Sequence, residues 1–124
     1  MDPKPKAIHR NQVRLERYKT KNVCTIRSLG APHSHSFHTK NISESGLLIV
    51  GAGAKYEFNK STMLEVCLSG TEQINFLTKV MRVNNNEFGL KIIQADRLEM
   101  EKYIQLINLL SKQLEEETKL QNVS

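Results

Sequence analysis

The sequence lacks long apolar runs, and none in its 124 residues approaches the roughly 20 residues that a membrane-spanning helix needs. Residues 1–6 also lack the apolar core of a secretory signal. We therefore expect a cytoplasmic protein without membrane insertion. Internal repeats and low-complexity tracts are missing too, and 39% apolar and 25% charged residues are ordinary proportions for one folded domain.

Cysteine is scarce, and Cys24 and Cys67 each stand in a strand-like apolar pattern. We expect both to be reduced core residues, because free cysteine is usually buried and cytosolic disulfides are rare. His33 and His35 would share one face of a strand, with His38 nearby, but no cysteine or carboxylate stands near them in sequence. We therefore expect exposed histidines and no metal site.

Catalytic patterns are also missing. No serine, cysteine or lysine stands in an arrangement that suggests a nucleophile with its base and orienting acid. The glycine-rich bend at residues 51–55 matches neither a P-loop nor a dinucleotide fingerprint, so we interpret it as a plain turn. The sequence predicts a protein that is not an enzyme and has no cofactor.

Positive charge is concentrated at the N-terminus. The first 28 residues hold eight basic and two acidic residues, whereas the remainder holds ten basic and eleven acidic residues. This distribution indicates a localised anion site or arm rather than a generally basic surface.

Six runs rich in β-branched and aromatic residues predict strands at residues 18–27, 34–40, 47–50, 63–68, 73–83 and 87–93. The links at residues 69–72 and 84–86 have the glycine and asparagine content of hairpin loops. Because short loops join antiparallel neighbours, we expect an antiparallel sheet.

After Ala95 the apolar period becomes helical. Asp96 and Glu99 have the spacing of an N-cap with its reciprocal partner. The apolar stripe favours packing of the helix on the open end of a small barrel. The alternative is a seam between two helices of a dimer. We therefore expect a monomer or a homodimer formed through this helix. The predicted fold is all-β with one C-terminal helix, a six-stranded antiparallel β-barrel. The stripe consists of Leu98, Tyr103, Ile104, Leu106, Ile107, Leu110 and Leu114.

Two short motifs predict a ligand site. Asn41, Ser43 and Gly46 form an Asn-x-Ser-x-x-Gly turn between two predicted strands, and Arg10 and Arg14 lie upstream in the basic segment. By composition the serine motif is expected about 0.04 times in such a chain, whereas two arginines four apart are expected about 0.3 times. The arginine pair alone is therefore weak evidence, and its weight comes from the turn motif downstream.

The residue types suit an anionic ligand that contains guanine. An arginine guanidinium grips phosphate bidentately and pairs with guanine O6 and N7. The side-chain carbonyl of Asn41 could accept from the N1 and N2 donors of guanine, which adenine lacks. Ser43 could donate to a phosphate or fix the loop by a local bond, and Gly46 could supply a positive φ or room for the ligand.

The order Arg10-x-x-x-Arg14, Asn41-x-Ser43-x-x-Gly46, a Phe-Gly-Leu-Lys-Ile strand at residues 88–92 and a terminal helix resembles the PilZ domain. The resemblance covers about residues 9–110. It implies a six-stranded barrel with a C-terminal helix and a bacterial receptor for cyclic diguanylate (c-di-GMP). It also implies that Arg10 and Arg14 contact phosphate and guanine, and that Asn41, Ser43 and Gly46 form the surface on the barrel. His9 stands where many members have a further arginine, which leaves the number of bound ligands open.

We expect a flexible arm at residues 1–8, a PilZ-like barrel with its helix at 9–114, and a frayed acidic helix end or tail at 115–124. The ligand would order the arginine loop on the barrel and change the surface shown to an unidentified effector protein. Two alternatives remain open: an adaptor that needs no ligand, and a basic barrel that binds single-stranded nucleic acid. Few aromatic residues accompany the basic ones, so we expect no nucleic-acid partner.

Overall fold

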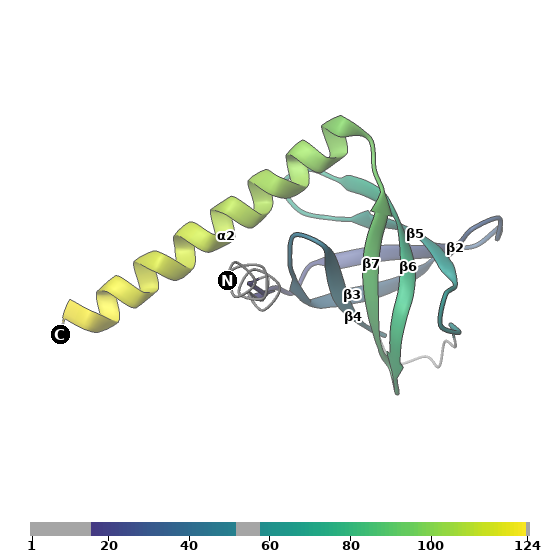
Figure 1. The fold of residues 1–124 in the computed structure, drawn as a ribbon, viewed down its shortest axis with the longest axis horizontal. Helices are drawn as coiled ribbons and strands as arrows, with labels where there is room; N and C mark the ends of the chain where they lie inside the picture. The colour runs from purple at the N-terminus through teal and green to yellow at the C-terminus, as the bar shows by residue number, and fades with distance from the viewer. Residues whose placement is uncertain (1–15, 52–57, 124) are drawn as a thin grey trace, which may run out of the picture.

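A closed barrel of six antiparallel strands and one long helix make up the described part of the chain (Figure 1). The structure is a computed structural model, and it describes residues 16–51 and 58–123. The predicted fold class is confirmed. In chain order the elements are β1 (Tyr18–Lys19), β2 (Val23–Ser28), β3 (His35–Ile42), β4 (Gly46–Gly51), β5 (Met63–Leu68), β6 (Ile74–Asn84), β7 (Glu87–Gln94) and α2 (Arg97–Val123).

The barrel closes because β3 pairs with both β2 and β4. The strands run in the order β3, β2, β5, β6, β7 and β4, and the pairing of β4 with β3 completes the circle. Every pairing is antiparallel, and the two residues of β1 add to β3 beside Ile42 and Asn41. A closed barrel leaves its strands no free edges to pair with other chains.

The first predicted strand was wrong in one respect: the chain forms two strands there, β1 and β2. Between them, the backbone N–H of Asn22 donates to the hydroxyl of Thr39 at 2.8 Å, and the Thr39 N–H donates to the Asn22 carbonyl at 2.8 Å. The hydroxyls of Thr20 and Thr39 lie 2.6 Å apart. Because the buried Thr39 hydroxyl engages this connection, the ladder is interrupted while both strands stay beside β3.

The core is formed by the apolar side chains at the inward-facing positions of the strands. Three phenylalanine rings, Phe37, Phe58 and Phe88, lie with centroids 5.3 to 6.0 Å apart, a spacing at which aromatic pairs attract. Helix α2 adds Tyr103 and Ile107 to the same core, so the expected packing of the helix on the barrel is confirmed. Three residues of the predicted stripe, Leu98, Ile104 and Leu114, are instead exposed. The other buried apolar residues are Cys24, Ile26, Ile42, Leu47, Ile49, Leu64, Val66, Leu68, Ile74, Phe76, Val80 and Leu90.

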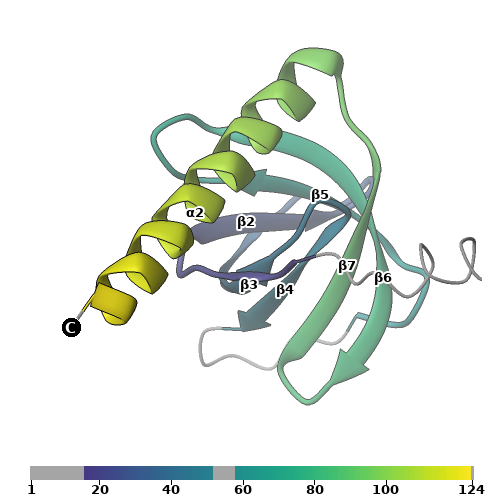
Figure 2. The same ribbon diagram turned by 60° about the vertical axis from the view of Figure 1, so that its left-hand side comes forward.

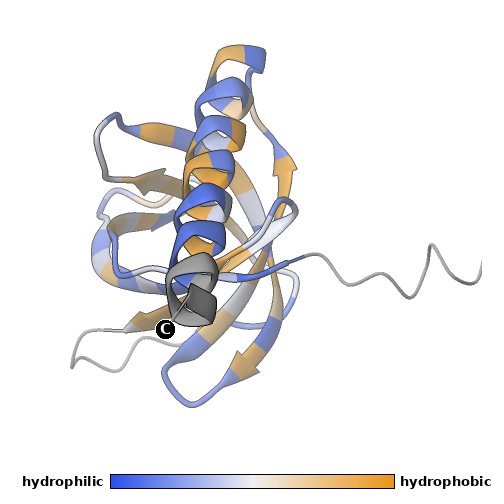
Figure 3. Cartoon of the chain, turned by 90° about the vertical axis from the view of Figure 1, so that its left-hand side faces the viewer, coloured by the Kyte–Doolittle hydropathy of each residue, from blue (hydrophilic) through white to orange (hydrophobic). Residues whose placement is uncertain are grey.

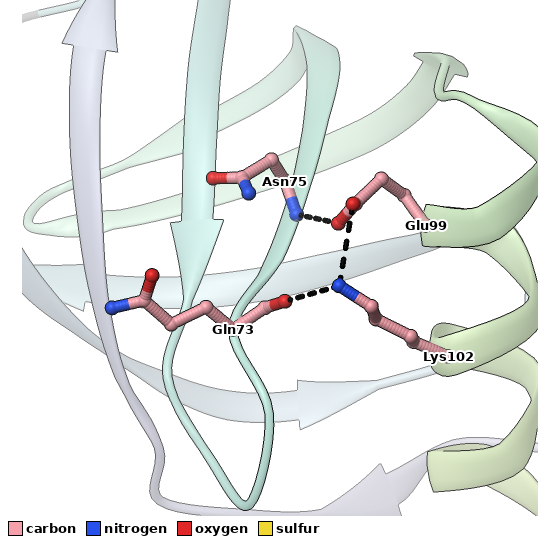
Figure 4. Close-up of polar contacts among 4 residues, drawn as sticks. All are labelled: Gln73, Asn75, Glu99 and Lys102. Atoms are coloured by element: carbon pink, nitrogen blue, oxygen red, sulfur yellow. Dashed lines mark hydrogen bonds and ion pairs between the residues drawn. The ribbon is translucent and has the colours of Figure 1, made fainter.

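The start of α2 is tied to β6 by a carboxylate (Figure 4). Glu99 Oε1 accepts the backbone N–H of Asn75 at 2.7 Å, and Lys102 Nζ lies 3.3 Å from Glu99 Oε2 and 3.2 Å from the carbonyl of Gln73. The expected reciprocal bond of Glu99 to the start of its own helix is therefore wrong. The hydrogen bond from Asn75, together with Lys102, lowers the pKa of Glu99.

Helix α2 is longer than the barrel needs. Its 27 residues give a rod of about 40 Å, and Figures 1 and 2 show the C-terminal part running past the strands. Figure 3 shows hydrophobic bands among hydrophilic ones on the side of the helix turned to the viewer. The helix continues past Leu114, after which we expected fraying, and ends at Val123.

The two cysteines differ in environment. Cys24 is fully buried, and burial, with a contribution from nearby Cys67, raises the pKa of its thiol to about 12. Cys67 points to the other side of β5 and is half-buried, so its expected place in the core is wrong. Both are free thiols.

The described residues, 16–51 and 58–123, lack two further features. No three His, Cys, Asp or Glu side chains in these ranges are grouped so that they could hold a metal ion. No helix in the same ranges is both long and apolar enough to cross a bilayer.

Candidate ligand-binding site

A β-bulge in β3 directs Asn41 to the outer surface of the barrel. The pairing of β3 with β4 shifts between Thr39 and Asn41. Thr39 and Ile42 both point inward although they are three residues apart, so Lys40 and Asn41 both point outward. Bulges commonly re-aim a side chain beside a functional site. The Asn41 side chain makes no hydrogen bond with any described residue, so its amide is available to a ligand.

The turn after Ile42 is closed by its own hydrogen bonds. The backbone N–H of Ser43 donates to the carbonyl of Gly46 at 2.9 Å, and the Ser43 hydroxyl lies 3.4 Å from the same oxygen. Ser43 is only 9% exposed. Of the two roles considered for this hydroxyl, the local bond is therefore the one formed within the protein.

Gly46 is required by the packing of two strands. A Cβ at this position would lie 2.1 Å from the carbonyl oxygen of Leu90 in β7, far inside contact distance. Gly46 pairs with Lys91 and does not have a positive φ; among the described glycines only Gly30 has one, at 86°. The first of the two roles considered for Gly46, a left-handed backbone, is thus wrong.

Helix α2 holds the turn in place through Tyr103. Its hydroxyl donates to the carbonyl of Ser43 at 2.6 Å and lies 3.2 Å from the carbonyl of Gly46. The side chain is fully buried, and this burial raises the pKa of the phenol. Because a buried carbonyl without a partner is costly, this bond fixes the turn relative to the helix.

A hollow of about 220 Å³ lies on the outer surface beside the turn, and we call it the turn hollow. Asn41, Ser43 and Gly46 line it, so the structure brings the three residues of the turn motif together. Three cations complete the lining: Arg17 before β1, Arg82 on β6 and Lys91 on β7.

None of these three cations forms an ion pair with a described carboxylate. Their charge is therefore available to an anion that enters the turn hollow. Arg10, Arg14 and His9 lie outside the described residues, so their positions stay predictions.

Arg17, Arg82 and Lys91 were missed at the sequence level. Arg17 lies three residues after Arg14 and could have been added to the predicted site because of its charge. Arg82 and Lys91 are more than 35 residues from the turn motif in the sequence. They come near it only because β4 pairs with β7 and β7 with β6, and this register is not visible in a single sequence.

Comparisons with known proteins agree with this architecture. The model of the family described as PilZ domain matches residues 8–109. No curated protein matches the sequence. Solved structures resemble the chain at low sequence identity, so they show the fold alone.

One neighbour is the PilZ domain with c-di-GMP of YcgR from Escherichia coli, with a TM-score of 0.69 and 12% identity over 87% of this chain and 98% of that one. The inhibitor of motility from Bacillus subtilis has a TM-score of 0.67 and 16% identity over 84% of this chain. This chain covers 52% of that protein, about half its length. The PilZ domain of CeSA from a cellulose-synthesizing bacterium has a TM-score of 0.63 and 12% identity over 77% of this chain and 98% of that one.

Proposed function

Because the chain belongs to the PilZ domain family, whose model matches residues 8–109, we propose that it is a bacterial receptor for c-di-GMP. Two facts support this proposal: the PilZ domain of Escherichia coli YcgR has the same fold, and its structure was solved with c-di-GMP. In this proposal the chain is a receptor or adaptor rather than an enzyme.

The observation that carries the proposal is the turn hollow. It combines an amide that no described residue binds with three cations that pair with no described carboxylate, and the turn between them is held by buried hydrogen bonds. Because these hydrogen bonds already fix the turn, little of the binding free energy is lost in ordering that part of the site.

Each residue then has a chemical role. The Asn41 carbonyl accepts from N1 and N2 of one guanine, which distinguishes guanine from adenine. Ser43 and Gly46 hold the turn against β7, and the ligand lies on their surface. Lys91 and Arg17 attract the phosphates.

The N-terminal segment supplies further contacts. Arg10 and Arg14 each offer a planar fork to a phosphate or to guanine O6 and N7, a contact that stabilises by about 1.5 to 3 kcal/mol when partly desolvated. His9 adjoins this pair and contacts the ligand beside it. Ligand binding fixes this segment on the barrel and changes the surface presented to an effector protein.

Calorimetric titration of the chain with c-di-GMP and with cyclic di-AMP tests the function. We expect binding of c-di-GMP and at least about 100-fold weaker binding of the adenine compound, because adenine leaves Asn41 without its donor pair. Equal binding of the two, or binding of neither, would refute the proposal. Binding of an oligonucleotide with a steep salt dependence would favour a nucleic-acid-binding barrel instead.

Two substitutions test the residue roles within this prediction. Arg14→Ala should abolish measurable binding, and Asn41→Asp should preserve it or tighten it up to about fivefold, because a carboxylate is the stronger acceptor. Lys112→Ala, which removes a charge from the exposed side of α2, is the control and should bind like the wild type. An Arg14→Ala variant with wild-type affinity would contradict the assignment of the arginine pair.

A further inference from the structure

A row of outward-facing residues crosses four strands beside the turn. Asn41 on β3 lies opposite Leu48 on β4, Leu48 lies opposite Gly89 on β7, and Gly89 lies opposite Arg82 on β6. Neighbouring strands are about 4.8 Å apart, so the row spans about 14 Å. The motif residues occupy only one end of this surface.

Gly89 leaves the middle of the row without a side chain. A Cβ at Gly89 would lie 3.4 Å from Cβ and 3.5 Å from Nε of Arg82, so the arginine side chain lies close over β7. Arg82 is exposed and has no ion-pair partner among the described carboxylates. A planar cation thus lies on the outer surface beside Gly89, at the end of the row opposite Asn41.

A second hollow, of about 390 Å³, lies on the other side of Arg82. We call it the hairpin hollow because it lies at the β6–β7 hairpin. It shares Leu48, Gly89 and Arg82 with the turn hollow, and neither Asn41, Ser43 nor Gly46 lines it. The two hollows are therefore contiguous, with Arg82 at their boundary.

The hairpin hollow has the groups that a guanine nucleotide needs. Glu87 Oε2 binds Lys40 at 2.9 Å, whereas Glu87 Oε1 has no hydrogen bond within the described residues and remains free to accept. Val83, 45% exposed, and the half-buried Leu48 offer apolar surface to a base. Lys60 adds an exposed cation.

We propose that the hairpin hollow is a second guanine subsite for the same ligand. This second proposal rests on the proposed function. It assigns one guanine of c-di-GMP to Asn41 in the turn hollow and the other to Glu87 in the hairpin hollow. Arg82 lies between them and contacts a phosphate of the ring that joins the two nucleosides. The two hollows together recognise both bases of the ligand. Adenine in the hairpin hollow is disfavoured because it lacks the N1 and N2 donors.

Titration of the full chain with c-di-GMP and with cyclic GMP-AMP tests this subsite. The wild type should bind c-di-GMP about tenfold more tightly than the mixed compound, whose guanine takes the turn hollow and whose adenine takes the hairpin hollow. Glu87→Gln should weaken c-di-GMP binding about tenfold and leave cyclic GMP-AMP binding unchanged. Glu72→Gln, in an exposed loop, is the matched control.

Two further variants test Arg82 and Gly89. Arg82→Ala should weaken binding of both compounds about tenfold, and Lys79→Ala, on the same strand but outside both hollows, should not. Gly89→Ala should keep the melting temperature of the wild type, because its Cβ finds ordinary contacts, and should weaken c-di-GMP binding by filling the space.

The outcomes separate this proposal from the proposed function. If the wild type binds c-di-GMP but Glu87→Gln binds both compounds as the wild type does, the second subsite is refuted and the receptor function stands. An equal loss for both compounds in Glu87→Gln also refutes guanine recognition there. If the wild type binds no c-di-GMP, both proposals fall.

Discussion

At the scale of single residues, one buried hydroxyl links the candidate site to the rest of the fold. Tyr103 reaches from α2 to the carbonyls of Ser43 and Gly46, and these two oxygens belong to the turn that presents Asn41. The side chain therefore contributes its hydroxyl to the site and its ring to the core.

Tyr103→Phe should lower the free energy of unfolding by about 1 to 3 kcal/mol, because it leaves the Ser43 carbonyl buried without its donor. The same variant should weaken c-di-GMP binding, since the turn is no longer fixed. Urea unfolding and calorimetry measure the two effects. Tyr18→Phe removes a hydroxyl that bonds no described residue and should change neither. Unaltered stability in Tyr103→Phe would show that the bond does not hold the turn.

The residues of the turn motif could be predicted, but their physical roles could not. Spacing alone marked Asn41, Ser43 and Gly46, because their types and order are uncommon together. It could not show that the Gly46 Cβ would meet the Leu90 carbonyl, since that contact depends on how β4 lies against β7. Loss of binding in a Gly46 variant would therefore report lost structure as well as lost contact.

At the scale of elements, the first turn of α2 is held by groups from another strand. Glu99 accepts from the backbone of Asn75, and Lys102 joins Glu99 to the Gln73 carbonyl. These bonds set the point from which the helix crosses the end of the barrel. The Lys102 ammonium group contacts both Glu99 and the carbonyl of Gln73, the residue before β6, so the anchor is a small network rather than a single pair.

The anchor should make stability depend on pH. The folded pKa of Glu99 is lowered from its ordinary value of 4.5, so its contribution is present above that value and is lost as the pH falls through the folded pKa. Glu99→Gln should therefore be less stable than the wild type at pH 7, and the difference should disappear in acid. Urea unfolding at both pH values measures it, with the exposed Glu115→Gln as control. A difference that persists in acid would contradict the assignment.

The strands were predictable to within about two residues wherever alternation and turn residues agreed. β5 has the same first and last residues as the predicted run at 63–68. The asparagine turn after β6 has the positive φ that such turns need, 55° at Asn85. The break between β1 and β2 was not predictable because it depends on the Thr39 hydroxyl, which comes from a different strand. The same holds for Glu99, whose partner is on β6.

At the scale of the whole molecule, the barrel and the first half of α2 form one packed unit. The apolar helix residues that pack on the core extend from Met100 to Leu110, and residues 115–117 are exposed. We propose that the folded domain ends near Leu114, as the sequence suggested.

A chain ending at Leu114 should unfold within about 2 °C of the full chain, because it keeps every helix residue that is described as packing on the core. It should also keep its affinity for c-di-GMP. A chain ending at Lys102 is the comparison, and it should lose the folded state because Tyr103 and Ile107 are removed from the core. Calorimetric melting measures both, and a large fall in the melting temperature of the first chain would place the boundary further on.

The length of α2 has a geometric consequence. From Tyr103, where the helix meets the turn, about 30 Å of rod extends to Val123. A tilt of only about 5° at that pivot therefore swings the far tip by about 3 Å. A small change in the angle of α2 at Tyr103 therefore produces a much larger displacement at the C-terminal end of the helix.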